Sequence, residues 1–376
     1  MTGITKIPFF GIDRQYKALR KEILDVTDSV YQSGLVLDNI WTAAFEDNIA
    51  KRCERKYAVA VNSGTQALIF ALRALDAVEE KARPLNKILI PSQSYVATVN
   101  SVLEAGFDPV FCDVDPVSGL IDLNKIPLEG NDISAIMYVN LFGNVIDQRK
   151  LIVYLEMFAK NKIPVIEDAA QSFGAYYQGV PSGKLGDISI LSFDPTKNLN
   201  NYGSGGMILT DVEEIYKCCL ALRDNGKLLH HTMSGTNSRM GEADCAQMLV
   251  KLDQFDEWQE RRTKIAEYYT EELNGLVGII PVTEEVEHAW SKFVIHHYER
   301  SRLHSDLEAE GIETRIHYTT PLHLHNVSFL SNFTNSTGYL EGAETFSKTC
   351  LSLPIYPELS DAEVEYVVDA VKQNIW

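Results

Sequence analysis

An alternation of short apolar runs with helical patterns, between residues 57 and 168, most constrains the fold of this chain. Five runs have the length and apolar character of strands: Tyr57–Asn62, Lys87–Ile90, Pro109–Asp113, Ser134–Val139 and Pro164–Asp168. Helical stretches at Gln66–Ala77 and Val96–Ala105 separate the first three of them. This rhythm is typical of strand–helix–strand units whose strands pair in parallel and are buried on both faces. The sequence therefore predicts an α/β fold with a mostly parallel sheet.

The pattern changes after Asp187. Two short strands are predicted at Ile188–Phe193 and Gly206–Thr210, around a loop rich in glycine and asparagine. An amphipathic helical region runs from about Glu242 to Leu273, and short strands with a closing helix at Asp361–Lys372 follow. We therefore predict a large α/β domain with an N-terminal segment, residues 1–245, and a smaller C-terminal α+β domain, residues 246–376.

Charge and cysteine usage narrow the class of protein. The formal net charge of -18 is spread along 376 residues, whereas a nucleic-acid-binding protein needs a basic face. The six cysteines contain no C-x-x-C pair and suggest no disulfide framework. No apolar run approaches the roughly 18 residues of a membrane span, and the first residues lack a signal pattern. We expect a cytoplasmic protein that binds neither nucleic acid nor membrane.

Residues that directly follow strands are the candidates for ligand binding, because an open parallel sheet binds its ligand at the carboxyl ends of its strands. Ser63-Gly64-Thr65 follows the first strand and opens a helix, where free N–H groups and the helix dipole favour a phosphate. An ordinary helix cap is the alternative interpretation. Tyr95 follows the second strand and is able to lie flat on a planar ring, with simple packing as its alternative.

Two charged residues complete the set of strand-end candidates. Asp168 ends an apolar strand, and a buried carboxylate is costly unless it is paired. Beside a protonated pyridine nitrogen it would be paired and would keep the ring electron-poor; helix capping is the alternative. Lys197 follows another strand, where a crevice poor in water would give it the lowered pKa of a carbonyl-attacking amine. Most lysines, however, are solvated surface charges.

In combination, these features resemble pyridoxal-phosphate enzymes of the aspartate aminotransferase superfamily, which have fold type I and a seven-stranded sheet. More specifically, the chain resembles the DegT/DnrJ/StrS family of sugar-nucleotide aminotransferases over nearly its whole length. The matching stretches follow the family order: Ile7–Phe10 with Arg14–Tyr16, Val61–Thr65, Glu167–Gln171, Ser192–Leu199, Gly205–Met207, Gly235–Met240, His317–Tyr318, Pro321–His323, and Leu351–Pro354 with Tyr356–Pro357.

The resemblance implies a cofactor role for each matched residue. Lys197 would hold pyridoxal 5'-phosphate covalently, Asp168 would face the ring nitrogen and Gln171 the phenolic oxygen. The remaining cofactor contacts comprise the phosphate ligands and the stacking aromatic: Gly64, Thr65, Ser192 and Tyr95. Asn237 would reach the phosphate bound by a neighbouring subunit, which implies a homodimer with shared sites.

The resemblance also implies an activity. An amino acid, expected to be L-glutamate, would leave its amino group on the cofactor as pyridoxamine phosphate, and a nucleotide-linked keto sugar would then receive that group. Lys197 would move the proton in both stages. The sugar nucleotide would contact His317, Tyr318 and His323. The form of the Lys197 motif favours carbon 3 of the sugar, with carbon 4 as the alternative; amino-sugar and polysaccharide biosynthesis is the expected context.

Other features leave open points. In the loop after Lys197, Ser204 and Asn200-Asn201 stand where the family often has an acid and a glycine, and none of these departures touches a cofactor residue. The nearby histidines His317, His323 and His325 lack a clustered carboxylate, and we predict no metal site. A nucleotide-sugar dehydrogenase would need G-x-G-x-x-G after its first strand, which is missing here. A non-catalytic regulator that binds pyridoxal phosphate remains the alternative in a different class.

Overall fold

A computed structural model describes residues 6–79, 86–126, 133–158, 163–325 and 339–375. Its centre is a seven-stranded sheet, as the α/β interpretation predicted. In spatial order the strands are β1 (Tyr57–Val61), β9 (Gly206–Thr210), β8 (Ile188–Ser192), β5 (Val165–Asp168), β4 (Ile133–Val139), β2 (Lys87–Pro91) and β3 (Asp108–Cys112). Only β9 runs antiparallel to its neighbours, and the six other strands share one direction. Their carboxyl ends therefore meet at one edge of the sheet.

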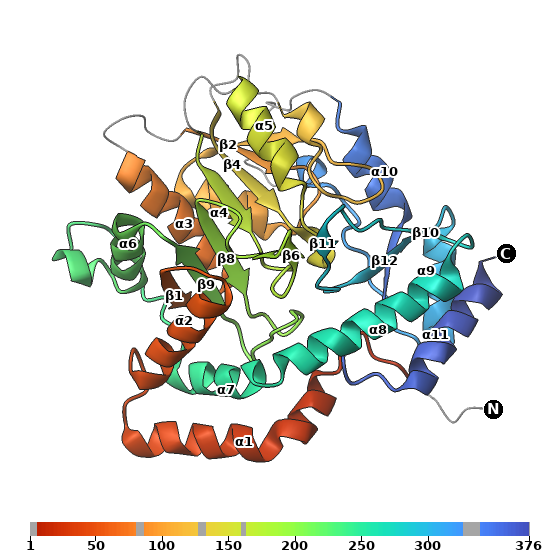
Figure 1. The fold of residues 1–376 in the computed structure, drawn as a ribbon, viewed down its shortest axis with the longest axis horizontal. Helices are drawn as coiled ribbons and strands as arrows, with labels where there is room; N and C mark the ends of the chain where they lie inside the picture. Colours follow the sequence, from red (N-terminus) through yellow and green to blue (C-terminus); the bar gives the residue numbers. More distant parts are fainter. Residues whose placement is uncertain (1–5, 80–85, 127–132, 159–162, 326–338, 376) are drawn as a thin grey trace.

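Successive side chains of a strand point to opposite faces of the sheet. The strands carry apolar side chains on both faces, so helices cover both. On one face Val59, Ile190 and Ile208 pack in the core beneath α3 (Gly64–Glu79), α4 (Ala97–Ala105) and α6 (Glu213–Arg223). On the other face Ala60 and Leu191 pack in a second core with α2 (Ile40–Arg52) and α7 (Glu242–Leu252). In Figure 1 the sheet is seen between these helices, with α5 (Gln148–Phe158) above it.

The predicted helical region at Glu242–Leu273 forms two helices, α7 and α8 (Phe255–Leu273), separated by Asp253 and Gln254. The boundary proposed after residue 245 lies inside α7, and the division into domains stays a prediction. In Figure 1, α8 continues from α7 towards α11 (Asp361–Asn374) at the far end of the molecule. The N-terminal helix α1 (Ile12–Ser33) contacts α7.

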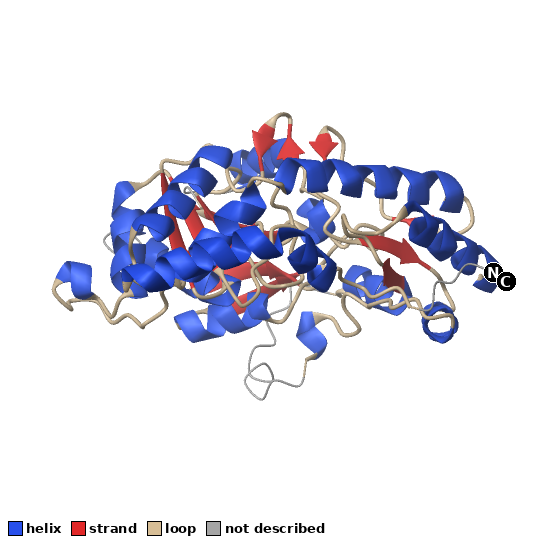
Figure 2. Ribbon diagram, turned by 90° about the horizontal axis from the view of Figure 1, so that it is seen from below, coloured by secondary structure: helices blue, strands red, loops and turns tan. Residues whose placement is uncertain are grey.

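A separate core lies at the C-terminal end of the molecule. It is built by α8, α11, α9 (Arg300–Ala309) and a sheet of β10 (Gly278–Ile279), β12 (Phe293–His296) and β13 (Cys350–Leu353). Figure 2 shows this sheet and the larger one at opposite ends of the long axis. Ile7 belongs to this core and bridges Ile312, so the start of the chain packs with its end.

Smaller elements complete the described structure. A third sheet joins β11 (Val286–Glu287), β6 (Tyr176–Tyr177) and β7 (Val180–Pro181), and α10 (Glu341–Thr349) precedes β13. The 3-10 helices are η1 (Leu123–Lys125), η2 (Leu141–Gly143), η3 (Lys227–Leu229) and η4 (Leu322–Leu324). Across the described ranges, no helix is both long enough and apolar enough to cross a bilayer.

Candidate active site

One pocket of about 450 Å³ opens at the carboxyl ends of the parallel strands. Its volume lies in the range of small-molecule sites. Nine of the residues predicted from sequence line it: Gly64, Thr65, Tyr95, Asp168, Gln171, Ser192, Lys197, His317 and Tyr318. The fold thus brings together segments that are up to about 250 residues apart in the chain.

The predicted phosphate site forms where β1 runs into α3. Gly64 is the first residue of α3, and Ser63 caps this helix, because its Oγ accepts from the Gln66 N–H at 3.1 Å. The N–H groups of Gly64 and Thr65, which line the pocket, are left for a ligand. A Cβ on Gly64 would come within 2.8 Å of the Cβ of Ser192 at the end of β8. Only a glycine therefore allows these two loops to approach, and their free polar groups face one concavity that suits a phosphate.

Asp168 ends β5 inside the same pocket and is 4 % exposed. Burial raises its pKa to about 6, although the Ala170 N–H, which donates to Oδ1 at 3.0 Å, and Lys197 oppose the shift. A carboxylate that loses water in this way is stabilised when a cation binds beside it. A protonated ring nitrogen would be such a cation.

The preceding residue, Glu167, is a contrasting case. It is fully buried and points away from the pocket lining, and its two oxygens accept hydrogen bonds from five groups: Asn140 Nδ2, Ser182 Oγ, Gly183 N, Leu185 N and Ser189 Oγ. This carboxylate needs no ligand because the protein itself satisfies it. Of the two adjacent acids, Asp168 is the one available to a ligand.

Lys197 follows β8 and extends into the pocket opposite Asp168. Burial lowers its pKa, while Asp168 and Asp194 favour the charged form and limit the shift. A lowered pKa increases the fraction of uncharged amine, which is the form that attacks a carbonyl. The pocket therefore holds an amine of raised nucleophilicity and a carboxylate that needs a cation.

Aromatic and polar side chains close the remaining sides. The Tyr95 ring lies 5.9 Å from the Tyr318 ring, and Gln171 Nε2 donates to the Tyr318 hydroxyl at 3.1 Å. His317 Nδ1 lies 2.7 Å from Ser352 Oγ. Burial lowers the pKa of His317 well below its ordinary value, and the nearby cations Lys292, Lys197 and Arg315 add to this effect. This imidazole is therefore neutral and available as a hydrogen-bonding group.

A sequence model of the DegT/DnrJ/EryC1/StrS aminotransferase family matches residues 17–372 of the chain. The chain belongs to this family. Among its relatives, the pleiotropic regulatory protein of Geobacillus stearothermophilus is 34% identical over 98% of both chains. The dTDP-3-amino-3,4,6-trideoxy-alpha-D-glucose transaminase of Streptomyces venezuelae is 33% identical, over 98% of this chain and 96% of the relative.

Solved structures agree with this membership of the aminotransferase family. The crystal structure of S. venezuelae DesV in complex with a ketimine intermediate superposes with a TM-score of 0.90 at 31% identity. The match covers 98% of each chain, so it includes the large sheet and the C-terminal core alike. The fold type implied by the sequence motifs is thereby confirmed.

Two of the residues predicted for the site, Asn237 and His323, do not line the pocket of their own chain. Asn237 is exposed, and Arg239 donates to its Oδ1 at 3.1 and 3.2 Å. His323 is only partly exposed on η4, and its Nε2 lies 3.5 Å from Glu344 Oε1 rather than at the pocket. The predicted sugar contact of His323 is thus not part of the pocket lining, and its role stays a prediction.

The structure also shows site residues that the sequence reasoning missed. Asp194, three positions before Lys197, lines the pocket and accepts hydrogen bonds from the Thr196 N–H and hydroxyl. Its spacing from Lys197 was the available signal. Ser94 and Thr98 also line the pocket and share a hydrogen bond of 2.8 Å. Their Ser and Thr side chains gave no comparable signal, because such residues are common after strands.

In the loop after Lys197 the structure gives Asn201 a role, while nothing in it explains the serine at position 204. Asn201 Nδ2 donates to the Ser204 carbonyl at 3.0 Å and to Asp244 Oδ1 at 3.2 Å, while its Oδ1 accepts from the Tyr202 N–H. Asn201 therefore closes the loop internally and ties it to α7. Within the described ranges, no group of three or more His, Cys, Asp or Glu side chains is arranged to hold a metal.

Proposed function

We propose that this chain is a pyridoxal-phosphate-dependent aminotransferase that transfers an amino group from an amino acid to a nucleotide-linked keto sugar. The observation that carries the proposal is the placement of Lys197, Asp168 and the Gly64 loop around one pocket. Amine, buried carboxylate and free helix N–H groups match, in chemistry, the aldehyde, ring nitrogen and phosphate of this cofactor.

When bound, the cofactor supplies an electron sink that stabilises negative charge at the carbon losing a proton. Asp168 would hold the proton on the ring nitrogen and thereby maintain that property. Gly64, Thr65 and Ser192 would bind the phosphate, Gln171 the phenolic oxygen, and Tyr95 the ring face. Lys197 Nζ would attach the cofactor and, when free, would move the proton at the α-carbon of the amino donor.

The acceptor and the reacting carbon are proposed from relatives. The S. venezuelae relative is a transaminase whose name specifies a 3-amino sugar carried by dTDP, and a ketimine is the product of an amine and a ketone. These findings support carbon 3 as the site of amination. The amino donor is proposed to be L-glutamate. His317 and Tyr318, which line the pocket, are available to contact the sugar nucleotide.

We further infer a homodimer with shared sites. Asn237 is exposed and is linked to an apolar strip through Arg239, which donates to Asn237 Oδ1 and lies 3.6 Å from Asp38 Oδ2 within the strip segment. The strip comprises Leu35, Val36, Leu37 and Ile40, which are 43 to 66 % exposed. A contiguous exposed apolar patch indicates a covering partner. All six cysteines are free thiols, which suits the reducing cytoplasm that we propose as the location.

Purified protein should be tested with L-glutamate and a panel of nucleotide keto sugars. Mass detection of an aminated sugar together with 2-oxoglutarate is the expected result. A protein that binds the cofactor but turns over no member of the panel would instead support a non-catalytic regulator. This second function is favoured by one observation: the G. stearothermophilus relative is named a pleiotropic regulatory protein.

A further inference from the structure

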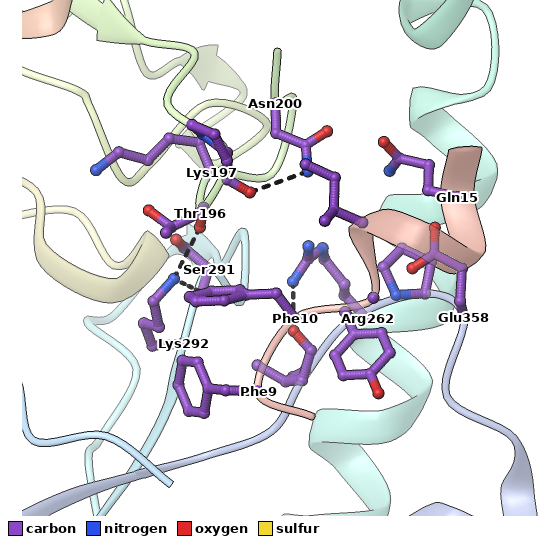
Figure 3. A pocket seen from close by; sticks show the side chains of 16 residues that line it. Phe9, Phe10, Gln15, Thr196, Lys197, Asn200, Arg262, Ser291, Lys292 and Glu358 are labelled. Atoms are coloured by element: carbon purple, nitrogen blue, oxygen red, sulfur yellow. Dashed lines mark hydrogen bonds between the residues drawn. The ribbon is translucent and has the colours of Figure 1, made fainter. Parts of the chain in front are cut away.

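The side of the Lys197 loop that faces away from the cofactor pocket is buried against charged side chains. A small cavity of about 20 Å³ lies there, between the N-terminal segment, the loop, α8 and the segment before α11. Figure 3 shows that Lys197 extends away from this cavity. We call the charged and polar side chains packed on this side the rear junction: Gln15, Lys251, Arg262, Lys292 and Glu358.

Two lysines of the rear junction have lost nearly all contact with water. Lys251 is 0 % exposed and Lys292 is 6 % exposed. Their hydrogen bonds go to carbonyl or amide oxygens, and neither forms an ion pair within the described ranges. Burying an amine without a carboxylate partner is costly. Burial of these two amines therefore lowers the free energy of unfolding, and a purpose other than stability has to explain their contacts.

Lys251 acts on the loop through Asn200. Its Nζ donates to the Asn200 carbonyl at 2.8 Å and to Asn200 Oδ1 at 3.0 Å, and it lies 3.5 Å from the centre of the Tyr202 ring. The Asn200 amide in turn donates to the Pro195 carbonyl at 3.2 Å. Asn200 is the residue that departs from the family glycine, and only a side chain can make this connection.

Lys292 acts on the next peptide group of the same loop. Its Nζ donates to the Thr196 carbonyl at 3.1 Å and to the Ser291 carbonyl at 2.8 Å, as Figure 3 shows. The Phe10 ring, 5.3 Å from Nζ, covers it. Lys292 directly precedes β12, so it connects the C-terminal core to the residue before Lys197.

We propose that Lys251 and Lys292 are positioning residues that hold the carbonyl groups of Pro195 and Thr196, and so fix the direction in which Lys197 enters the cofactor pocket. Lys251 does so through Asn200, which makes Asn200 and Lys251 a matched pair. The proposal rests on the proposed role of Lys197. A purely structural role would stabilise the fold without changing the loop or the cofactor.

Hydrogen exchange of the full-length, cofactor-free protein tests whether Lys251 and Lys292 hold the loop. The amides of Thr196, Lys197 and Asn201 are bonded to Asp194 Oδ1, Asp194 O and Phe193 O, so their exchange reports on loop opening. Lys251→Met and Lys292→Met should each speed their exchange by about tenfold. Lys184→Met is the control for loss of a lysine away from the loop: Lys184 also donates to a backbone carbonyl, that of Glu54, but it is partly exposed and pairs with Asp211. Equal exchange in all variants would overturn the proposal.

A double-mutant cycle tests the matched pair with bound cofactor. Lys251→Met should raise the rate of cofactor release and alter its visible circular dichroism, and Asn200→Gly should do the same. In the Asn200→Gly background Lys251→Met should add less than about twofold, whereas Lys292→Met should retain its full effect. Additive effects of Asn200→Gly and Lys251→Met would refute the pairing. If Lys251→Met does not fold, Asn200→Gly alone must still speed loop exchange in the cofactor-free protein.

The two proposals fail in different ways. If Lys197 is not the cofactor lysine, Lys197→Ala will keep a borohydride-reducible cofactor, while loop exchange still responds to Lys251→Met and Lys292→Met. If Lys251 and Lys292 do not hold the loop, Lys197→Ala will lose the borohydride-reducible cofactor, and Lys251→Met and Lys292→Met will leave the exchange rates of the loop amides unchanged.

Discussion

The two sides of the Lys197 loop use buried polar groups in opposite ways. On the pocket side, the free groups of Asp168, Lys197 and Gly64 face a cavity large enough for a cofactor. On the other side, Lys251 and Lys292 are bonded to backbone carbonyls, and Lys292 lines a cavity about the size of one water molecule. The pocket-side groups are thus available to a ligand, whereas the two lysines are committed to backbone carbonyls of the loop. This holds for the lysines and not for the whole rear junction, since Gln15 Oε1, Arg262 Nε and Glu358 Oε1 are buried there without a hydrogen-bond partner among the described residues.

The largest expected effect comes from the pocket side. Lys197→Ala should reduce turnover by about ten-thousandfold or more, because it removes both the cofactor attachment and the proton carrier. The measurement is product formation with glutamate and a keto sugar, together with borohydride reduction and mass analysis of the protein. The wild-type protein should be yellow. A reducible cofactor retained on another lysine would contradict the assignment.

Asp168→Asn should reduce turnover by about a hundredfold or more, since the amide cannot hold the pyridine proton. Near-normal turnover would exclude the proposed role. The same change should stabilise the cofactor-free protein at neutral pH. Burial raises the pKa of Asp168 to about 6 from 3.8, so the stability that its protonated form contributes is present below pH 3.8 and lost as pH rises through 6.

Denaturant unfolding of the cofactor-free protein measures this second effect. The difference between Asp168→Asn and the wild type should be small near pH 4 and should grow to the order of 3 kcal/mol by pH 8, in favour of the variant. A difference that does not vary with pH would mean that the carboxylate is not desolvated by its pocket. Gain of stability with loss of turnover is the expected signature of a functional group.

The shared-site model predicts a recovery of activity. Asn237→Asp should weaken cofactor binding across the interface by like-charge repulsion, and Lys197→Ala disables its own subunit. When both inactive variants are refolded together, half of the dimers are mixed, and each mixed dimer has one intact site. The pool should regain about a quarter of wild-type activity by two-fold symmetry. No recovery, with mixed dimers verified by mass, would place Asn237 in its own subunit's site.

The rear junction is expected to change how folding stability depends on pH. Burial lowers the pKa of Lys251 to about 7 from 10.5, and Glu358 opposes the shift; the Tyr202 ring and Asn200 also face the amine. Between these pH values the unfolded chain binds a proton that the folded chain does not, so folding stability should rise with pH. In Lys251→Met this rise should be reduced by at most about 1.4 kcal/mol per pH unit. Unfolding midpoints between pH 7 and pH 10 measure it, and an unchanged slope would show that Lys251 stays charged.

The sequence predicted which residues gather at the pocket because its signals are local, while their roles stay predictions. A strand ends, a helix begins, and Gly64, Asp168 or Lys197 stands at that junction, so the parallel sheet alone brings these residues together. The predicted strands agree with the observed ones within one residue at each end. The family resemblance then assigned roles that no single residue would have justified.

The rear junction could not be predicted in this way. The hydrogen bonds of Lys251 and Lys292 join segments about 50 to 100 residues apart, and nothing in the sequence near either lysine signals them. Helices α1 and α2 were also missed. Only Gln15, Ile23 and Val30 of α1 are buried, so few core residues mark this helix in the sequence. The position of His323 depends on its packing against Glu344, which motif order does not encode.

The reversed direction of β9 has a consequence for how the protein is made. Gly206 begins β9 between Val61 and Ser192, so β9 joins the two halves of the proposed phosphate site. On the ribosome, β1 and the Gly64 loop emerge early, but their bonding partner is synthesised only after Lys197 itself. A nascent chain that stops before Thr210 has no assembled phosphate site. With the phosphate bound as proposed, we expect cofactor capture to be a late event in biogenesis, restricted to chains whose central sheet is complete.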